Sequence, residues 1–143
     1  MQAYGIRVLG PSLVIPLRDV AGRLHSLQFI GPDGRKTFLS GARKRGCYYA
    51  IGRPVDALCI CEGYCTAASI FECTGHATAC AFDAGNLEPV ARALRSKFPR
   101  LRLILCADND AETPGNPGVR YAEAAARAVC GFLAVPTFDG VSA

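Results

Sequence analysis

The sequence has 143 residues, half of them hydrophobic, and a formal net charge of +4. A chain of this length and composition can bury a substantial core, which excludes a disordered tail. No apolar run approaches the roughly 18 residues of a membrane span, and the first residues lack the layout of a signal peptide. We therefore expect a soluble, cytoplasmic protein with no membrane partner.

The eight cysteines lie mostly inside apolar segments, as small buried side chains do. Cys59, Cys61 and Cys65 are close together in sequence, but they form no CxxC pair, and His25 and His76 are isolated. This spacing favours packing over a zinc site, and free thiols fit a reducing compartment.

Residues 1 to 54 predict a small, β-rich antiparallel subdomain. Strands are expected at 12 to 17, 24 to 30, 36 to 39 and 47 to 51, separated by turns that contain glycine. The pair Asp33-Gly34 indicates a hairpin. The segment "GPDGRKT" resembles a phosphate-binding loop, but its glycine spacing differs and no helix follows, so we interpret it as this hairpin.

Residues 55 to 138 alternate between short apolar strands and amphipathic helices. Strands are expected at 57 to 61, 77 to 82, 101 to 106 and 132 to 138, and helices at 64 to 74, 87 to 98 and 117 to 130. Asn86 and Asn116 are the expected N-caps, and Gly75 the expected C-cap. This order predicts an α/β fold with a four-stranded, mainly parallel, Rossmann-like sheet flanked by helices. Residues 139 to 143 would form a tail.

Carboxylates follow two of the expected strands. Glu62 comes directly after one strand, and Asp108 and Asp110 follow another, so all three are predicted at the same edge of the sheet. Such a group can bind Mg²⁺, and Glu62 can act as a general base. A calcium loop is excluded because Thr113 and Val119 stand where glycine and glutamate are needed. The remaining alternative is a set of solvated carboxylates at a turn and a helix start.

Positive charge is concentrated in the first part of the chain. Residues 1 to 54 carry nine Lys or Arg and two Asp, whereas residues 55 to 143 have a net charge of −3. Arg43, Lys44 and Arg45 form a basic loop between two glycines, and Lys36 precedes it. Their charge alone favours binding of nucleic acid or nucleotides, although such loops are often only solvated.

Two segments resemble the motifs of a known domain family. "ALCICEGYCTAASI" (57 to 70) and "LILCADND" (103 to 110) resemble the two acidic motifs of Toprim domains. The preceding "LVIPLRDVAGRLHSLQFIGPDGRKTFLSG" is similar to the segment before the Toprim domain in bacterial-type primases. The elements "EG", "FDAGNL" and "AD.D.ET.GN.G" are most similar to primase-like regions of plasmid and phage replication proteins.

This resemblance implies a Toprim-type fold and a DNA primase-like nucleotidyltransferase that synthesises RNA primers. The substrates would be single-stranded DNA template and nucleoside triphosphates, and the partner a replicative helicase or a fused helicase domain. Glu62 would be the general acid/base, and it would share Mg²⁺, or alternatively Mn²⁺, with Asp108 and Asp110. No zinc-binding template module is recognised, so we expect a fragment of a larger protein. The alternatives are a Toprim nuclease and a non-catalytic nucleic-acid-binding module.

Overall fold

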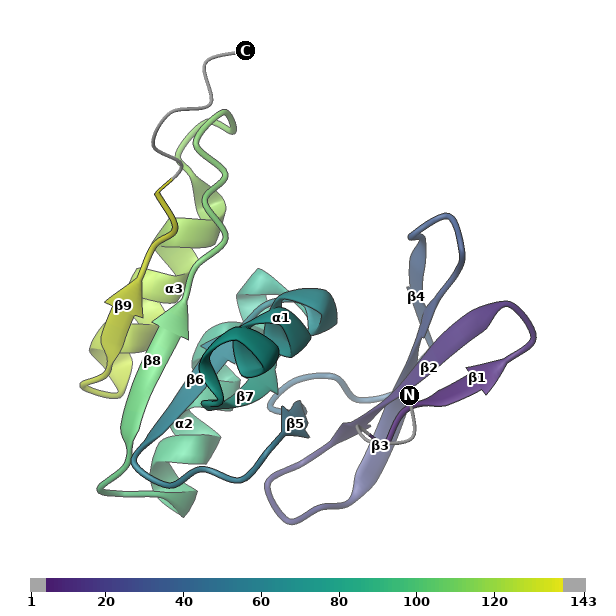
Figure 1. Ribbon diagram of the computed structural model, residues 1–143, viewed down its shortest axis with the longest axis horizontal. Helices are drawn as coiled ribbons and strands as arrows, with labels where there is room; N and C mark the ends of the chain where they lie inside the picture. Colours follow the sequence, from purple (N-terminus) through teal and green to yellow (C-terminus); the bar gives the residue numbers. More distant parts are fainter. Residues whose placement is uncertain (1–4, 138–143) are drawn as a thin grey trace.

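The computed structural model describes residues 5–137 and contains two β-sheets (Figure 1). The first is antiparallel, with the strand order β1-β2-β3-β4. Its strands are β1 (Arg7–Leu9), β2 (Ser12–Arg18), β3 (Leu24–Ile30) and β4 (Lys36–Phe38). The sequence predicted β2, β3 and β4. It did not predict β1, because three exposed residues give no burial pattern to recognise.

The hairpin predicted at Asp33-Gly34 is confirmed. Gly34 has φ 81° and donates its N–H to the carbonyl of Gly31, and β3 and β4 pair on either side of the turn. Glycine adopts this left-handed conformation without steric cost, which explains the residue at this position.

The second sheet has five strands in the order β5-β7-β6-β8-β9. Four of them are parallel, as predicted: β6 (Ala57–Cys61), β7 (Ala77–Cys80), β8 (Arg102–Cys106) and β9 (Phe132–Ala134). The fifth, β5 (Tyr49–Ile51), pairs antiparallel with β7. The last strand was predicted at 132 to 138, but β9 ends at Ala134 and residues 135 to 137 are not in a strand. Residue 138 and the predicted tail lie outside the described residues.

The position of β5 corrects one expectation. We predicted the segment 47 to 51 as part of the first antiparallel unit, but β5 extends the second sheet, and an isolated bridge between Arg18 and Tyr48 joins the preceding residue to β2. Tyr49 and Ile51 are buried in the core under α1. Pairing with β7 buries both side chains, and a three-residue pattern does not identify that partner.

Three helices cover the parallel strands. They are α1 (Tyr64–Thr74), α2 (Leu87–Lys97) and α3 (Pro117–Ala128). In Figure 1, α1 lies in front of the sheet, and α2 and α3 lie behind it. Leu87, Val90 and Leu94 of α2 are almost fully buried against the sheet, and each contributes roughly 1.5 to 3 kcal/mol by leaving water. The predicted C-cap of α1 is confirmed, because Gly75 has φ 74° and its N–H bonds the carbonyl of Phe71.

The cysteines are free thiols. Cys47, Cys59, Cys61 and Cys80 are buried, and Cys106 is half-buried, as small apolar side chains would be. Cys65, Cys73 and Cys130 are exposed instead. Among the helices between residues 5 and 137, none combines the length and the apolar character that crossing a bilayer requires.

Candidate active site

The two acidic motifs meet at the carboxyl edge of the parallel sheet. Cys61 and Cys106 are register partners at the ends of β6 and β8, so the residues that follow them emerge side by side. The carboxyl groups of Glu62 and Asp108 lie close enough to interact. The structure therefore brings these two predicted residues together.

Glu62 has an unusual protonation equilibrium. Burial is the largest cause, and together with the charge and the neighbouring carboxyl group of Asp108 and the charges of Asp110 and Asp83 it raises the pKa of Glu62 from 4.5 to about 7. Since all of these charges are negative, the site favours a proton or a cation between the carboxyl groups. Crowding of this kind is typical of functional sites.

The loop after β8 is held by backbone and amide hydrogen bonds. Oδ2 of Asp110 accepts from the N–H of Gly118 at 3.1 Å. The N–H of Asp110 donates to Oδ1 of Asn116 at 2.9 Å, and Nδ2 of Asn116 donates to Oδ1 of Asn109 at 2.9 Å. A Cβ atom on Gly118 would lie 2.2 Å from the carbonyl oxygen of Asp108. Only glycine fits here.

Asn86 and Asn116 occupy the predicted N-cap positions but do not cap their helices. Neither side chain makes the capping hydrogen bond of α2 or α3, which corrects the role we predicted. Each amide instead holds a loop, which is adjacent in sequence for Asn116 and about forty residues away for Asn86. Asn116 holds the acidic loop after β8, and Asn86 holds the basic loop.

Two of the four predicted basic residues lie at this acidic edge. Nζ of Lys36 lies 3.8 Å from where a Cβ on Gly63 would be, next to Glu62 in the chain. Lys44 pairs with Asp83, and its Nζ lies 4.7 Å from the centre of the Phe38 ring. Lys36 therefore lies beside the segment that follows β6, and Lys44 is held by Asp83, whose charge also acts on Glu62.

The other two basic residues face α2. Arg43 and Arg45 line a cavity of about 490 Å³ together with Pro89 and Ala93. Arg45 also lines an adjoining cavity of about 210 Å³ with Arg92, Tyr121 and others. The predicted basic loop thus divides between two surfaces.

Sequence reasoning missed the segment after β7. Phe82 has φ 75°, which is rare for an aromatic residue, and its ring packs edge-on against Phe38 with 6.1 Å between ring centres. Asp83 follows it and acts on both Lys44 and Glu62. We noted "FDAGNL" as a recurring element, but no local pattern indicated its role.

The residues present suit a hard divalent cation. Between residues 5 and 137, no three His, Cys, Asp or Glu side chains are arranged to hold a metal ion. Mg²⁺ needs only one or two protein carboxylates in addition to water and substrate phosphate. Glu62, Asp108 and Asp110 can supply them.

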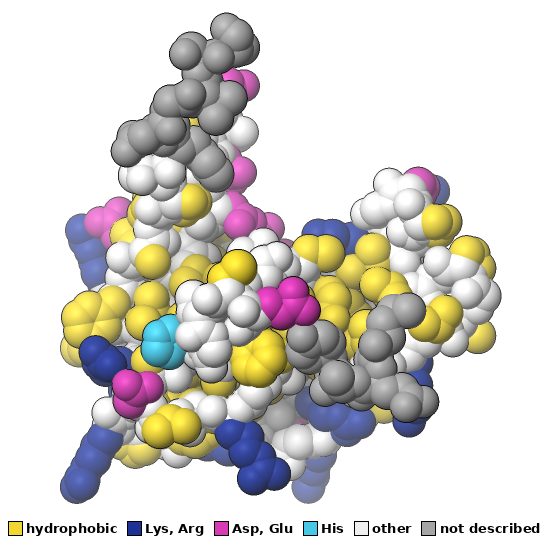
Figure 2. Space-filling model, viewed as in Figure 1, with side chains coloured by type: hydrophobic (Ala, Val, Ile, Leu, Met, Phe, Trp, Pro, Cys, Tyr) yellow, Lys and Arg dark blue, Asp and Glu magenta, His cyan; other side chains and the backbone are white. Residues whose placement is uncertain are grey.

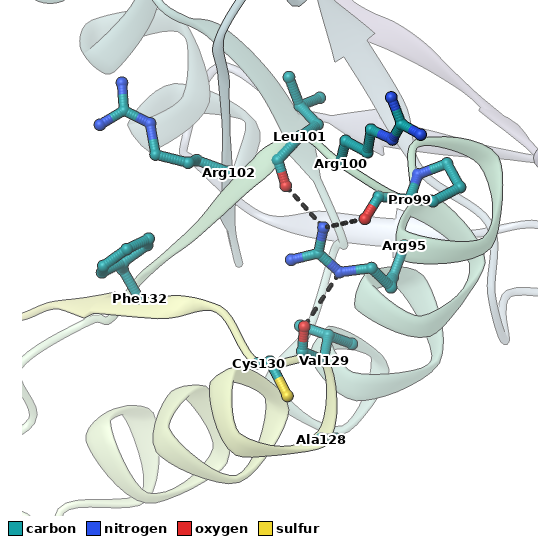
Figure 3. Close-up of a pocket in the computed structure, with 9 residues that line it drawn as sticks. All are labelled: Arg95, Pro99, Arg100, Leu101, Arg102, Ala128, Val129, Cys130 and Phe132. Carbon is teal, nitrogen blue, oxygen red and sulfur yellow. Dashed lines mark hydrogen bonds between the residues drawn. The ribbon is translucent and has the colours of Figure 1, made fainter.

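A cavity of about 520 Å³ lies at the opposite, amino end of the parallel strands (Figure 3). It is lined by Arg95, Arg100, Arg102 and Phe132, among others. The guanidinium of Arg95 donates to the carbonyls of Val129 and Leu101 at 3.0 and 2.6 Å. Its hydrogen bonds join the ends of α2 and α3 to the start of β8, which is a structural role.

Comparison with known proteins identifies the domain. Residues 57–137 match the family model of the Toprim domain. The chain belongs to the Toprim family. Two proteins of Escherichia coli, each named DNA primase TraC, are 44% and 42% identical to it over 96% and 90% of this chain. The match spans only 11% and 13% of the length of those relatives.

Solved structures agree with this fold. The primase fragment of the bacteriophage T7 primase-helicase protein superimposes with a TM-score of 0.67 and 16% identity, covering 96% of this chain and 60% of that one. The predicted α/β, Toprim-type architecture with an antiparallel β unit is therefore confirmed.

Proposed function

We propose that this Toprim domain is the catalytic core of a DNA primase and joins ribonucleotides into primers on single-stranded DNA. The observation that carries the proposal is the meeting of Glu62 with Asp108 at the sheet edge, where the pKa of Glu62 is raised to about 7. A carboxylate at this edge of the sheet can accept the proton of an attacking hydroxyl.

Each side chain has a proposed task. Asp108 and Asp110 would supply carboxylate ligands to Mg²⁺ or Mn²⁺ beside Glu62, and the ion would neutralise charge on the triphosphate. Glu62 accepts the proton of the primer hydroxyl at its carboxylate while the hydroxyl oxygen bonds the α-phosphorus of the incoming nucleotide and pyrophosphate leaves. Lys36 and Lys44 bind phosphate oxygens of the nucleotide. Arg43 and Arg45 bind phosphates of the template strand along α2.

The names of the relatives support primer synthesis over phosphodiester cleavage, because both TraC proteins are described as primases. The T7 neighbour is described as a primase-helicase protein, which supports a helicase, separate or fused, as a partner. A Toprim nuclease would use the same carboxylates, so assays must measure nicking of plasmid DNA as well as nucleotide incorporation.

The test is incorporation of labelled ribonucleotides on single-stranded DNA with Mg²⁺ or Mn²⁺. Asp108→Asn should lower the rate at least roughly a hundredfold. Glu112→Gln is the matched control, because Glu112 is an exposed carboxylate on the same loop, and this variant should keep the activity. Equal rates for wild type and Asp108→Asn, or nicking without incorporation, would contradict the proposal.

A further inference from the structure

Asn86 is a buried polar residue whose hydrogen bonds reach far along the chain. Its side chain is 4% exposed. Oδ1 accepts the N–H of Gly46 at 2.8 Å, and Nδ2 donates to the carbonyls of Lys44 and Cys47 at 3.2 and 3.0 Å. A further contact joins Nδ2 to the carbonyl of Ala81 at 2.8 Å. All four partners are backbone atoms, so Asn86 fixes the path of the chain whatever side chains the loop carries.

The clamped segment is a turn within the basic loop. The N–H of Cys47 bonds the carbonyl of Lys44 at 2.9 Å, and Gly46 has φ 74°. The loop lies between β4 and β5 and has no strand or helix of its own to hold it. Asn86 supplies the backbone contacts that join this turn to the end of β7.

The segment that contains Asn86, residues 82 to 86, also contacts Glu62 at the acidic edge of the sheet. The N–H of Phe82 donates to the carbonyl of Glu62 at 2.8 Å. Oδ1 of Asp83 accepts the N–H of Asn86 at 2.9 Å, while its other oxygen pairs with Lys44. Residues 82 to 86 therefore connect the backbone of Glu62 to the backbone and the ammonium group of Lys44.

From this connection we infer that Asn86 is a positioning residue, which sets Lys44 and the basic turn at a fixed place relative to Glu62. The inference deepens the proposed function and rests on it, since Lys44 is the group that would bind nucleotide phosphate. Misplacement of a charged group by about 1 Å is enough to weaken such binding strongly. None of the four partner residues lies within a strand.

Primer synthesis and hydrogen exchange by NMR test this role together. In Asn86→Ala, the KM for ribonucleotide should rise on the order of tenfold, with a smaller change in kcat. The amide of Gly46 should lose its protection from exchange, while amides of β8 keep theirs. Asn86→Asp keeps the acceptor for Gly46 but loses the donors, so it should raise KM and retain part of the protection at Gly46.

Thr78→Val is the matched control. Thr78 is fully buried in β7 and donates to the carbonyl of Ala67 at 3.2 Å, so this change deletes a buried hydrogen bond without touching the basic turn. Its KM should stay within about twofold of wild type. Equal KM changes in the Asn86 and Thr78 variants would overturn the inference.

Hydrogen exchange also tests, independently of catalysis, whether Asn86 holds the basic turn. If the amide of Gly46 in the wild-type protein exchanges as fast as an amide without a hydrogen bond, Asn86 does not hold the turn and the inference is wrong. A wild-type protein that makes no primers would overturn the proposed function, and the protection of Gly46 would still decide whether Asn86 holds the turn.

Discussion

Charged side chains have opposite surroundings at the two ends of the parallel sheet. At the carboxyl end, burial of Glu62 and the nearby charges of Asp108 and Asp110 raise the pKa of Glu62 to about 7. At the amino end, Arg95 is surrounded by carbonyl oxygens that accept its hydrogen bonds (Figure 3). Figure 2 shows a related separation on one face, where Lys and Arg gather along the lower edge and several Asp and Glu lie near the end of β8.

This difference separates stability from function. A charge whose hydrogen bonds are satisfied by the backbone holds elements together, as Arg95 does. Like charges brought together without compensation destabilise the metal-free fold and are retained where they bind a ligand. Substitutions that remove a charge at the two ends should therefore have opposite consequences for stability.

The largest expected effect is that of Gly118→Ala at the carboxyl end. The new methyl group would collide with the carbonyl oxygen of Asp108 and with Oδ2 of Asp110, which are 2.2 and 2.9 Å from it. The acidic loop must shift, so activity should fall on the order of a hundredfold, and stability should fall by about 1 to 3 kcal/mol. Steady-state kinetics and urea unfolding measure both. Unchanged kinetics would mean that the position of this loop does not matter.

Arg95→Met at the amino end should affect stability alone. The change keeps much of the side-chain volume but leaves the carbonyls of Leu101 and Val129 without their donor, at a cost of about 1 to 3 kcal/mol. Kinetic constants measured well below the unfolding temperature should match those of wild type. A selective loss of activity in a stably folded variant would contradict the division between the two ends.

Glu62→Gln should stabilise the protein in the absence of metal. The pKa of Glu62 in the fold lies above its ordinary value of 4.5, so wild type loses stability as pH rises from about 4.5 to about 7. The neutral variant escapes this loss. Allowing for partial solvent screening, it should gain roughly 1 to 2 kcal/mol at pH 8 and nothing at pH 4. Thermal unfolding of both proteins at both pH values measures this difference. A variant that is less stable than wild type at pH 8 would contradict the prediction.

The smallest effect is expected for Arg102→Gln, in the same cavity as Arg95. Arg102 pairs with Asp56 at 3.3 Å, but both side chains are more than half exposed, at 60% and 66%. Such a pair contributes well under 1 kcal/mol. Urea unfolding of both variants measures this difference. If Arg102→Gln lowers the free energy of unfolding as much as Arg95→Met does, exposure does not explain the difference between the two arginines.

The sequence predicted the features that depend on local pattern. The parallel strands follow from short apolar runs, and the approach of Glu62 and Asp108 follows from the rule that such strands end at one edge. Their spacing along the chain was sufficient for this prediction, although it could not reveal the raised pKa of Glu62, which arises from burial and neighbouring charge.

Features that depend on distant partners were missed. Asn86 has the sequence context of an N-cap, yet its amide bonds a turn about forty residues earlier, and no periodicity encodes that choice. The strand β5 was assigned to the wrong sheet for the same reason. Among the four basic residues, only the structure separates Lys36 and Lys44 from Arg43 and Arg45.

The most direct test of the acidic edge is the titration of the Glu62 carboxyl carbon by ¹³C NMR, with and without Mg²⁺. We predict a midpoint near 7 without metal. Mg²⁺ should lower it by more than about one unit, because a cation between the carboxylates favours their ionised forms. A midpoint near 4.5 that Mg²⁺ does not change would contradict the account.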